Sequence, residues 1–134
     1  MTERQFPLSP RSVRHLRIGD LIAVPVEPAG WACLQVVDLA DSGPGSRTTF
    51  IAGVIRWRGD EPPSASSVAG LAAIEQGMTG VEIFTEAGLQ VSGNAPVVDS
   101  GLPSNIRDMS VGTTHKVWGW RTAVRRAQAA AAAR

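Results

Sequence analysis

The 134-residue chain has one cysteine, two histidines and no tyrosine. A single cysteine, Cys33, cannot close an intramolecular disulfide, which favours a reducing cytoplasm as the compartment. The two histidines, His15 and His115, are far apart in the sequence and do not make the ligand cluster that a zinc site requires. We therefore expect a domain that folds without a disulfide, a metal or another cofactor.

Long apolar runs and a large net charge are lacking as well. The apolar runs extend over only a few residues, against the roughly 20 that a membrane span needs. Residues 1–17 contain four arginines and no apolar core of a secretion signal, so we expect neither export nor a membrane. The net charge of +1 excludes a uniformly basic nucleic-acid-binding protein. The length suits one domain with its own hydrophobic core.

The charged residues are distributed unevenly along the chain. Residues 1–17 carry four arginines against one acid, and residues 107–134 carry five arginines and a lysine against one acid. Residues 18–106 carry three arginines against ten acids. Either the two basic ends fold back on the acidic body or remain in solvent, or they form one basic docking surface.

Three stretches rich in β-branched and apolar residues predict strands over 18–26, 31–39 and 48–58. Turn-forming residues over 27–30 join the first two stretches into a hairpin. Along the third strand, the two-residue period places Trp57 on the core face, with its neighbours Arg56 and Arg58 facing solvent.

The second half of the chain has shorter patterns. Apolar residues spaced at three and four predict a helix over 64–76, after which Gly77 suits a helix end. Short strands are expected over 80–84, 89–92 and 114–120.

The last helix is expected over 122–133 from its high alanine content. Alanine offers little side-chain area to bury. We therefore expect this helix to fray and residues 127–134 to be dispensable.

The order of these elements predicts an α+β fold. Tight turns between strands favour a mainly antiparallel curved sheet or a small partly open barrel, with one mid-chain helix and a C-terminal helix. We expect an N-terminal arm over 1–16, a single domain over 17–120 and a helical tail over 121–134.

Catalytic motifs are scarce. Cys33 lies in an apolar strand, which favours a buried thiol over a nucleophile. The glycine-rich stretch 43–46 lacks the lysine that follows in a phosphate-binding loop. Asp20 and Asp38 are candidates to meet across the first hairpin, either as an acid–base pair or, for Asp20, as a turn residue after Gly19. The sequence assigns no catalytic residue and no metal ligand.

The most distinctive side chains are four tryptophans. Either they fill the core, or some form an exposed aromatic patch beside arginines. Tryptophan and arginine are enriched at interface hot spots, and aromatic rings also stack single-stranded bases. The residues predicted to bind a partner are Arg56, Arg58, Asp60, Lys116 and Trp118.

Two segments resemble strands of the immunity protein 26 family. Residues 17–26, RIGDLIAVPV, resemble the family's opening strand, in which a basic and an apolar residue precede Gly-Asp and a proline lies near the end. Residues 31–37, WACLQVV, are similar to the second strand, with Leu34 and Gln35 where the family usually has a glycine and a basic residue.

The resemblance continues late in the chain. Residues 88–97, GLQVSGNAPV, resemble the family's stretch in which Gly-Asn is followed, after one variable residue, by a proline and an apolar residue, with Leu89 where a tryptophan is common. The WGW sequence at 118–120 is similar to the family's ending, which tends to keep a tryptophan. In outline the resemblance extends over 17–120.

This resemblance implies a bacterial immunity protein of a polymorphic toxin system, which binds a cognate protein toxin and neutralises it without catalysis. An acidic central region suits a basic nuclease toxin. Some family members carry a phosphotriesterase label, so a small metal-dependent hydrolase is one alternative. An SH3-like nucleic-acid-binding or ribonuclease barrel is the other, although the balanced charge disfavours a nucleic acid as partner.

Overall fold

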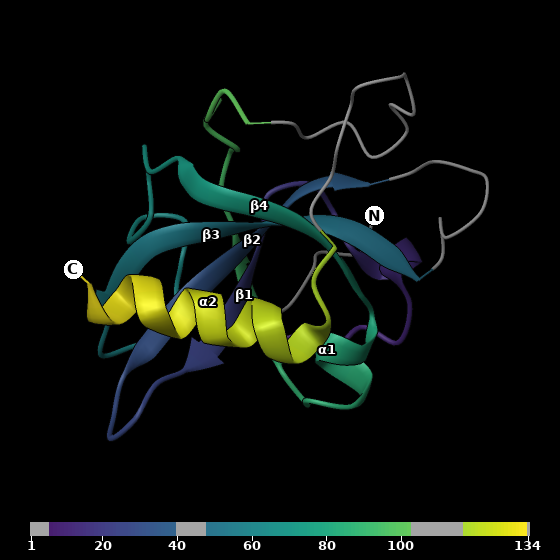
Figure 1. Ribbon diagram of the computed structural model, residues 1–134, viewed down its shortest axis with the longest axis horizontal. Coiled ribbons are helices and arrows are strands. Elements are labelled where there is room, and N and C mark those ends of the chain that lie inside the picture. The colour runs from purple at the N-terminus through teal and green to yellow at the C-terminus, as the bar shows by residue number, and fades with distance from the viewer. Residues whose placement is uncertain (1–5, 40–47, 103–116, 134) are drawn as a thin grey trace.

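The computed structural model describes residues 6–39, 48–102 and 117–133, and it has the predicted α+β architecture (Figure 1). Five antiparallel strands form a curved, unclosed sheet in the order β4-β3-β2-β1-β5. The strands are β1 (Asp20–Pro25), β2 (Trp31–Leu39), β3 (Thr49–Gly59), β4 (Ala73–Gly80) and β5 (Gln90–Asn94). The helices are the 3-10 helix η1 (Val13–His15), the single-turn α1 (Glu82–Thr85) and the long α2 (Trp120–Ala132).

The predicted hairpin of β1 and β2 is confirmed. Leu21 pairs with Gln35 at one end of the hairpin, and Pro25 pairs with Trp31 beside the turn. Gly30 closes the turn with a φ of 113°, in the left-handed region that favours glycine. The β-branched and apolar run of β1 is fully buried up to its last residue, as its composition indicates.

The sheet has hydrophobic clusters on both faces, because successive side chains of a strand point to opposite sides. On one face, Phe50 and Val54 of β3 belong to the main core with α2. On the other face, Ile55 and Trp57 of the same strand pack with Cys33. The alternation predicted for β3 is therefore confirmed.

The alanine-rich helix α2 lies across the sheet and forms part of the main core (Figure 1). Ala123, Ala127, Ala130 and Ala131 are all buried. The expectation that this helix frays with little to bury is wrong. Each alanine buries little area, but a row of small side chains lets the helix backbone come close to the strands, so the helix covers the larger side chains beneath it.

The helix predicted over 64–76 is wrong. Residues 73–80 form β4, which pairs with β3 through partners such as Met78 with Ile51. Of the apolar positions that suggested a helix, Val68 is buried, but Leu71 and Ile74 are 38% and 49% exposed. Pairing with a distant strand has overridden the local period.

Two of the short strands are also misplaced. Residues 82–85 form the single turn of α1, so the mid-chain helix lies there and not at 64–76. In 114–120, Val117 makes an isolated bridge with Met78, and Trp120 begins α2. Residues 114–116 lie outside the described residues. The strand predicted over 89–92 is present as β5.

Part of the segment before β1 also belongs to the core. Val13 and Leu16 are buried in the main cluster. Leu8 exchanges two backbone hydrogen bonds with Val91 of β5, at N···O distances of 2.9 and 2.7 Å. The described residues of the expected arm are therefore packed against the domain.

Candidate partner-binding site

The predicted arginines lie at the end of β3, beside the C-terminal end of α2. Both Arg56 and Arg58 are exposed and Trp57 faces the core, as predicted. The Arg56 Nη2 donates to the carbonyl of Ala133 at 3.1 Å, where a cation interacts favourably with the end of a helix. The Arg58 Nη2 donates to the carbonyl of Ala29 at 3.0 Å. Both guanidinium groups therefore stabilise the fold in addition to being accessible.

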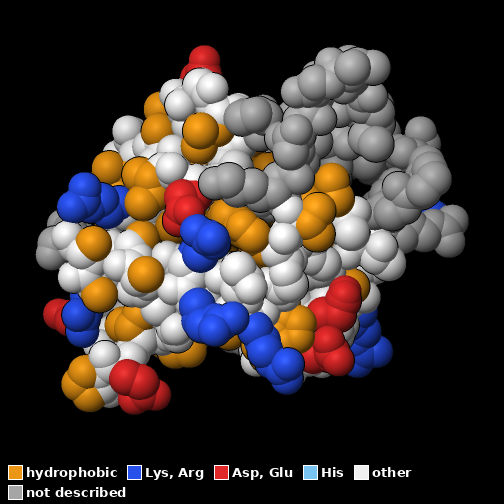
Figure 2. Space-filling model, in the orientation of Figure 1, with side chains coloured by type: hydrophobic (Ala, Val, Ile, Leu, Met, Phe, Trp, Pro, Cys, Tyr) orange, Lys and Arg blue, Asp and Glu red, His pale blue; other side chains and the backbone are white. Residues whose placement is uncertain are grey.

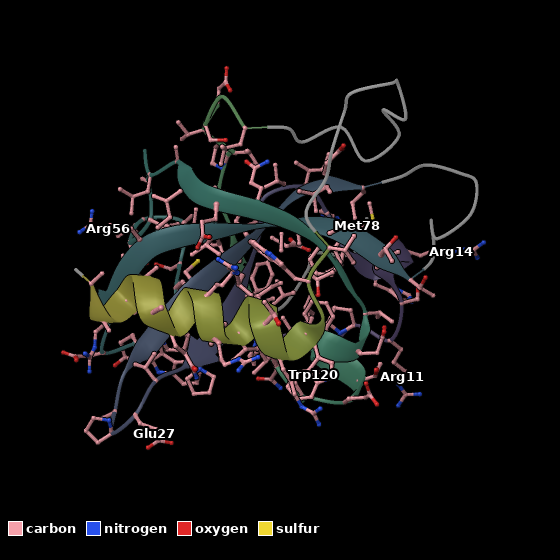
Figure 3. All side chains as sticks on the ribbon, in the orientation of Figure 1. Arg11, Arg14, Glu27, Arg56, Met78 and Trp120 are labelled. Carbon is pink, nitrogen blue, oxygen red and sulfur yellow. The ribbon has the colours of Figure 1, made fainter. Side chains whose placement is uncertain are left out.

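The structure brings only part of the predicted patch together. Asp60 is exposed and lines a hollow of about 520 Å³ with Arg58 and the last turn of α2. Trp118 is 5% exposed and packs against Gly77, so it is a core residue. Figure 3 shows Arg56 and Trp120 at opposite ends of α2. Lys116 lies outside the described residues.

The arginines of α2 have two kinds of environment. Arg126 forms an ion pair with Glu75 of β4, so this part of the basic end folds back on the acidic body. Arg121 and Arg125 are exposed, and the Arg121 guanidinium lies 4.9 Å from the ring centre of Trp120. Figure 2 shows lysine and arginine side chains scattered among apolar ones on the face that carries α2.

Each of the two candidate carboxylates accepts a hydrogen bond from a nearby backbone N–H. The fully buried Asp20 accepts from the backbone N–H of Arg17 at 2.8 Å and from the Nδ2 of Asn94 at 3.0 Å. Asp38 accepts from the backbone N–H of Leu39 at 2.9 Å. The bond to Arg17 is the turn contact expected of an aspartate that follows a glycine.

The Gly-Asp and Gly-Asn motifs of the resemblance meet in space, and we call their contact the β1–β5 clasp (residues 19–20 with 94–95). The Ala95 N–H donates to the Gly19 carbonyl at 3.0 Å, and the Gln35 Nε2 donates to the Ala95 carbonyl at 2.9 Å. Gly19 has a φ of 95°, and a Cβ there would lie 2.5 Å from the Ala95 oxygen. The motif residues therefore hold β5 against β1 and β2.

An uncharged groove, hereafter the Trp31 groove, opens beside β1 and β5. It has a volume of about 540 Å³, and none of the described residues that line it is charged. Trp31 is half-buried there and packs against the core cluster that contains Trp57. Its other large apolar walls include Phe6, Pro7, Pro25, Pro62 and Leu89.

Sequence reasoning missed the Trp31 groove, because its walls come from segments that are far apart in the chain. The available signal was indirect. Trp31, Pro25 and Leu89 all lie in the segments that resemble the immunity family, but no local pattern shows that they share a surface.

Cys33 is confirmed as a buried thiol. Burial raises the pKa of the Cys33 thiol far above its ordinary range, and the Sγ donates to the Leu34 carbonyl at 3.4 Å. Over the described ranges, no three side chains of His, Cys, Asp or Glu lie together as a metal site requires.

The concave surfaces of the described chain differ in chemistry. The Trp31 groove is uncharged and apolar, whereas the hollow at Asp60 is bordered by a cation and an anion.

No helix in the described part is both long and apolar enough to cross a bilayer. A scan against protein-family models and searches of curated proteins and of solved structures find no match to this chain.

Proposed function

We propose that this chain is a non-catalytic binding protein that neutralises a protein toxin by covering part of its surface. The resemblance to the immunity protein 26 family suggests this role. The three main segments of the resemblance supply the adjacent strands β2, β1 and β5. The clasp joins the Gly-Asp motif at the start of β1 to the Gly-Asn motif at the end of β5.

The Trp31 groove is the observation that carries the proposal. A concave, uncharged surface with a half-buried tryptophan suits the anchoring side chain of a protein partner, because such anchors supply most of the binding energy at interfaces. We expect an apolar side chain of the toxin to enter the groove, with charged residues of both proteins at the rim.

The test begins with affinity capture from the native cell, followed by expression of each captured protein alone and with this chain. One captured protein should stop growth alone, and coexpression of this chain should restore growth. Failure of every captured protein to be toxic, or failure of the chain to protect, would overturn the proposal.

Two variants locate the surface. Phe6→Asp places a charge at a groove residue that is 39% exposed, and we expect it to weaken toxin binding at least about tenfold, the equivalent of about 1.4 kcal/mol. Ile18→Asp is the matched control, because Ile18 is 52% exposed and does not line the groove. Equal binding by the two variants would remove the groove from the interface.

The alternatives predict different outcomes with the same purified protein. A chelator should leave the melting temperature unchanged, whereas a metal-dependent hydrolase would lose stability or activity. A salt-sensitive mobility shift with RNA, in the absence of any toxin, would favour a nucleic-acid-binding barrel.

A further inference from the structure

Three arginines lie in the described part of the segment before β1, over residues 6–19. Arg11, Arg14 and Arg17 are exposed, and residues 6–19 contain no aspartate or glutamate. In the described structure, none of their guanidinium groups has an ion pair or a side-chain hydrogen bond. Asp20, the first acid after this segment, is buried in the clasp. This stretch therefore presents three exposed guanidinium groups that make no ion pair within the described residues.

The backbone of this segment is held in place by buried apolar residues. Leu8 is bonded to Val91, and Val13 and Leu16 are buried in the main core. The three arginines are spaced three residues apart, and buried anchors lie between them in the sequence. Their exposed side chains are therefore on the outer side of the segment.

Local hydrogen bonds fix the positions of two of the arginines. The Arg14 N–H donates to the Ser12 Oγ at 3.2 Å, at the beginning of η1. The Arg17 N–H donates to Asp20 at 2.8 Å, at the beginning of β1. A fixed backbone lowers the entropy that a ligand must overcome to order its site.

The arginines surround a pocket of about 550 Å³ that we call the arginine pocket. Its charged and polar walls include Arg11, Arg14, Arg17 and His15, and its apolar walls include Leu8 and Leu16. Figure 3 shows Arg11 and Arg14 on the same side of the molecule, spaced apart and extending outward. The spacing suits several anionic groups better than one small ion.

We propose that the arginine pocket binds a small molecule that carries two or more phosphate groups and an apolar organic part. Guanidinium groups bind phosphate oxygens in a bidentate geometry, and several cations around a concave surface attract a polyanion. The volume is in the range of small-molecule sites, and Leu8 and Leu16 offer a wall for the organic part. This binding goes beyond the proposed toxin neutralisation and does not depend on it.

Titration calorimetry of the whole chain tests the proposal, with ADP, inorganic pyrophosphate and adenosine as probes. ADP should bind at least tenfold more tightly than adenosine, and pyrophosphate should compete with it. The double variant Arg11→Ala/Arg14→Ala should weaken ADP binding about tenfold or more, since each lost charge-assisted hydrogen bond corresponds to about that factor. Its melting temperature should stay unchanged, because neither guanidinium is bonded within the described chain.

The matched control is Arg121→Ala/Arg125→Ala, which removes the same charge from the exposed side of α2. The control should bind ADP within about twofold of the unmodified chain. Absence of ADP and pyrophosphate binding, or an equal loss in both double variants, would overturn the proposal. Binding of a single-stranded oligonucleotide without binding of ADP would also overturn it, in favour of a nucleic-acid surface.

Discussion

Replacement of Ala127 by leucine tests how α2 contributes to stability. Ala127 belongs to α2 and is fully buried in the main core, on the side of the helix that faces the sheet. Leucine is almost as good a helix former as alanine, so the substitution leaves the helix propensity nearly unchanged. Any large change in stability therefore reports packing between the helix and the sheet.

The expected loss follows from the burial of Ala127. Three additional carbon atoms have no space beneath a helix held close by alanines, and overpacking of this kind costs about 1–3 kcal/mol. For a domain of this size the melting temperature should fall by about 3–10 °C. Ala129→Leu is the control on the same helix, because Ala129 is exposed and a change there should stay within about 0.5 kcal/mol.

The assay is urea and thermal unfolding, followed by tryptophan fluorescence and circular dichroism. A second variant, which ends the chain at Arg126, removes the buried Ala127, Ala130 and Ala131. At about 0.8 kcal/mol for each buried methyl group, it should lose at least about 2 kcal/mol. Equal stability of Ala127→Leu and Ala129→Leu, together with a harmless truncation, would refute the packing of α2 on the sheet.

Three further predictions concern the sheet. Gly77→Ala should cost about 1–3 kcal/mol in chemical denaturation, because its Cβ would lie 2.4 Å from the Trp118 ring, and Trp118→Leu in the same chain should recover part of that loss. Asn94→Ala should cost about 1–3 kcal/mol by removing a hydrogen bond to a buried carboxylate, whereas Gln90→Ala, at an exposed position of the same strand, should be nearly neutral. The raised pKa of Cys33 predicts that the free energy of unfolding decreases as the pH rises above the ordinary thiol range, because only the unfolded chain then loses the thiol proton. Denaturation curves at pH 7 to 10 should show this decrease, and Cys33→Ala should abolish the part of it that comes from the thiol.

Local patterns were sufficient for the first half of the sheet. The β-branched runs and the turn at Gly30 predict the β1–β2 hairpin, and the two-residue period predicts which side chains of β3 face the core. The same period places Arg56 and Arg58 in solvent, as observed. It contains no information about the Ala133 and Ala29 carbonyls that they bind, since those contacts join distant segments.

The candidate sites were less accessible to sequence reasoning. Phe6, Trp31, Pro62 and Leu89 share one groove only after the sheet has formed. Trp118 was predicted to be at a partner surface, but its ring is covered by β4 and α2, with the Arg126 guanidinium 5.4 Å from the ring centre. A tryptophan beside arginines is compatible with either position, and only the neighbouring elements determine its exposure.

The sequence by itself determined the elements whose residues carry their own signal: β1, β2 and β3 by strand composition and alternation, and α2 by alanine content. Tertiary structure decided the rest. The helix predicted over 64–76 does not form, and its last residues belong to β4, because the backbone groups of residues 73–80 pair with β3. The alanines of α2 have little area of their own, but they become core residues because the sheet beneath them supplies the larger side chains. Such contacts depend on which distant segments come together, and a local pattern of residues does not encode that choice.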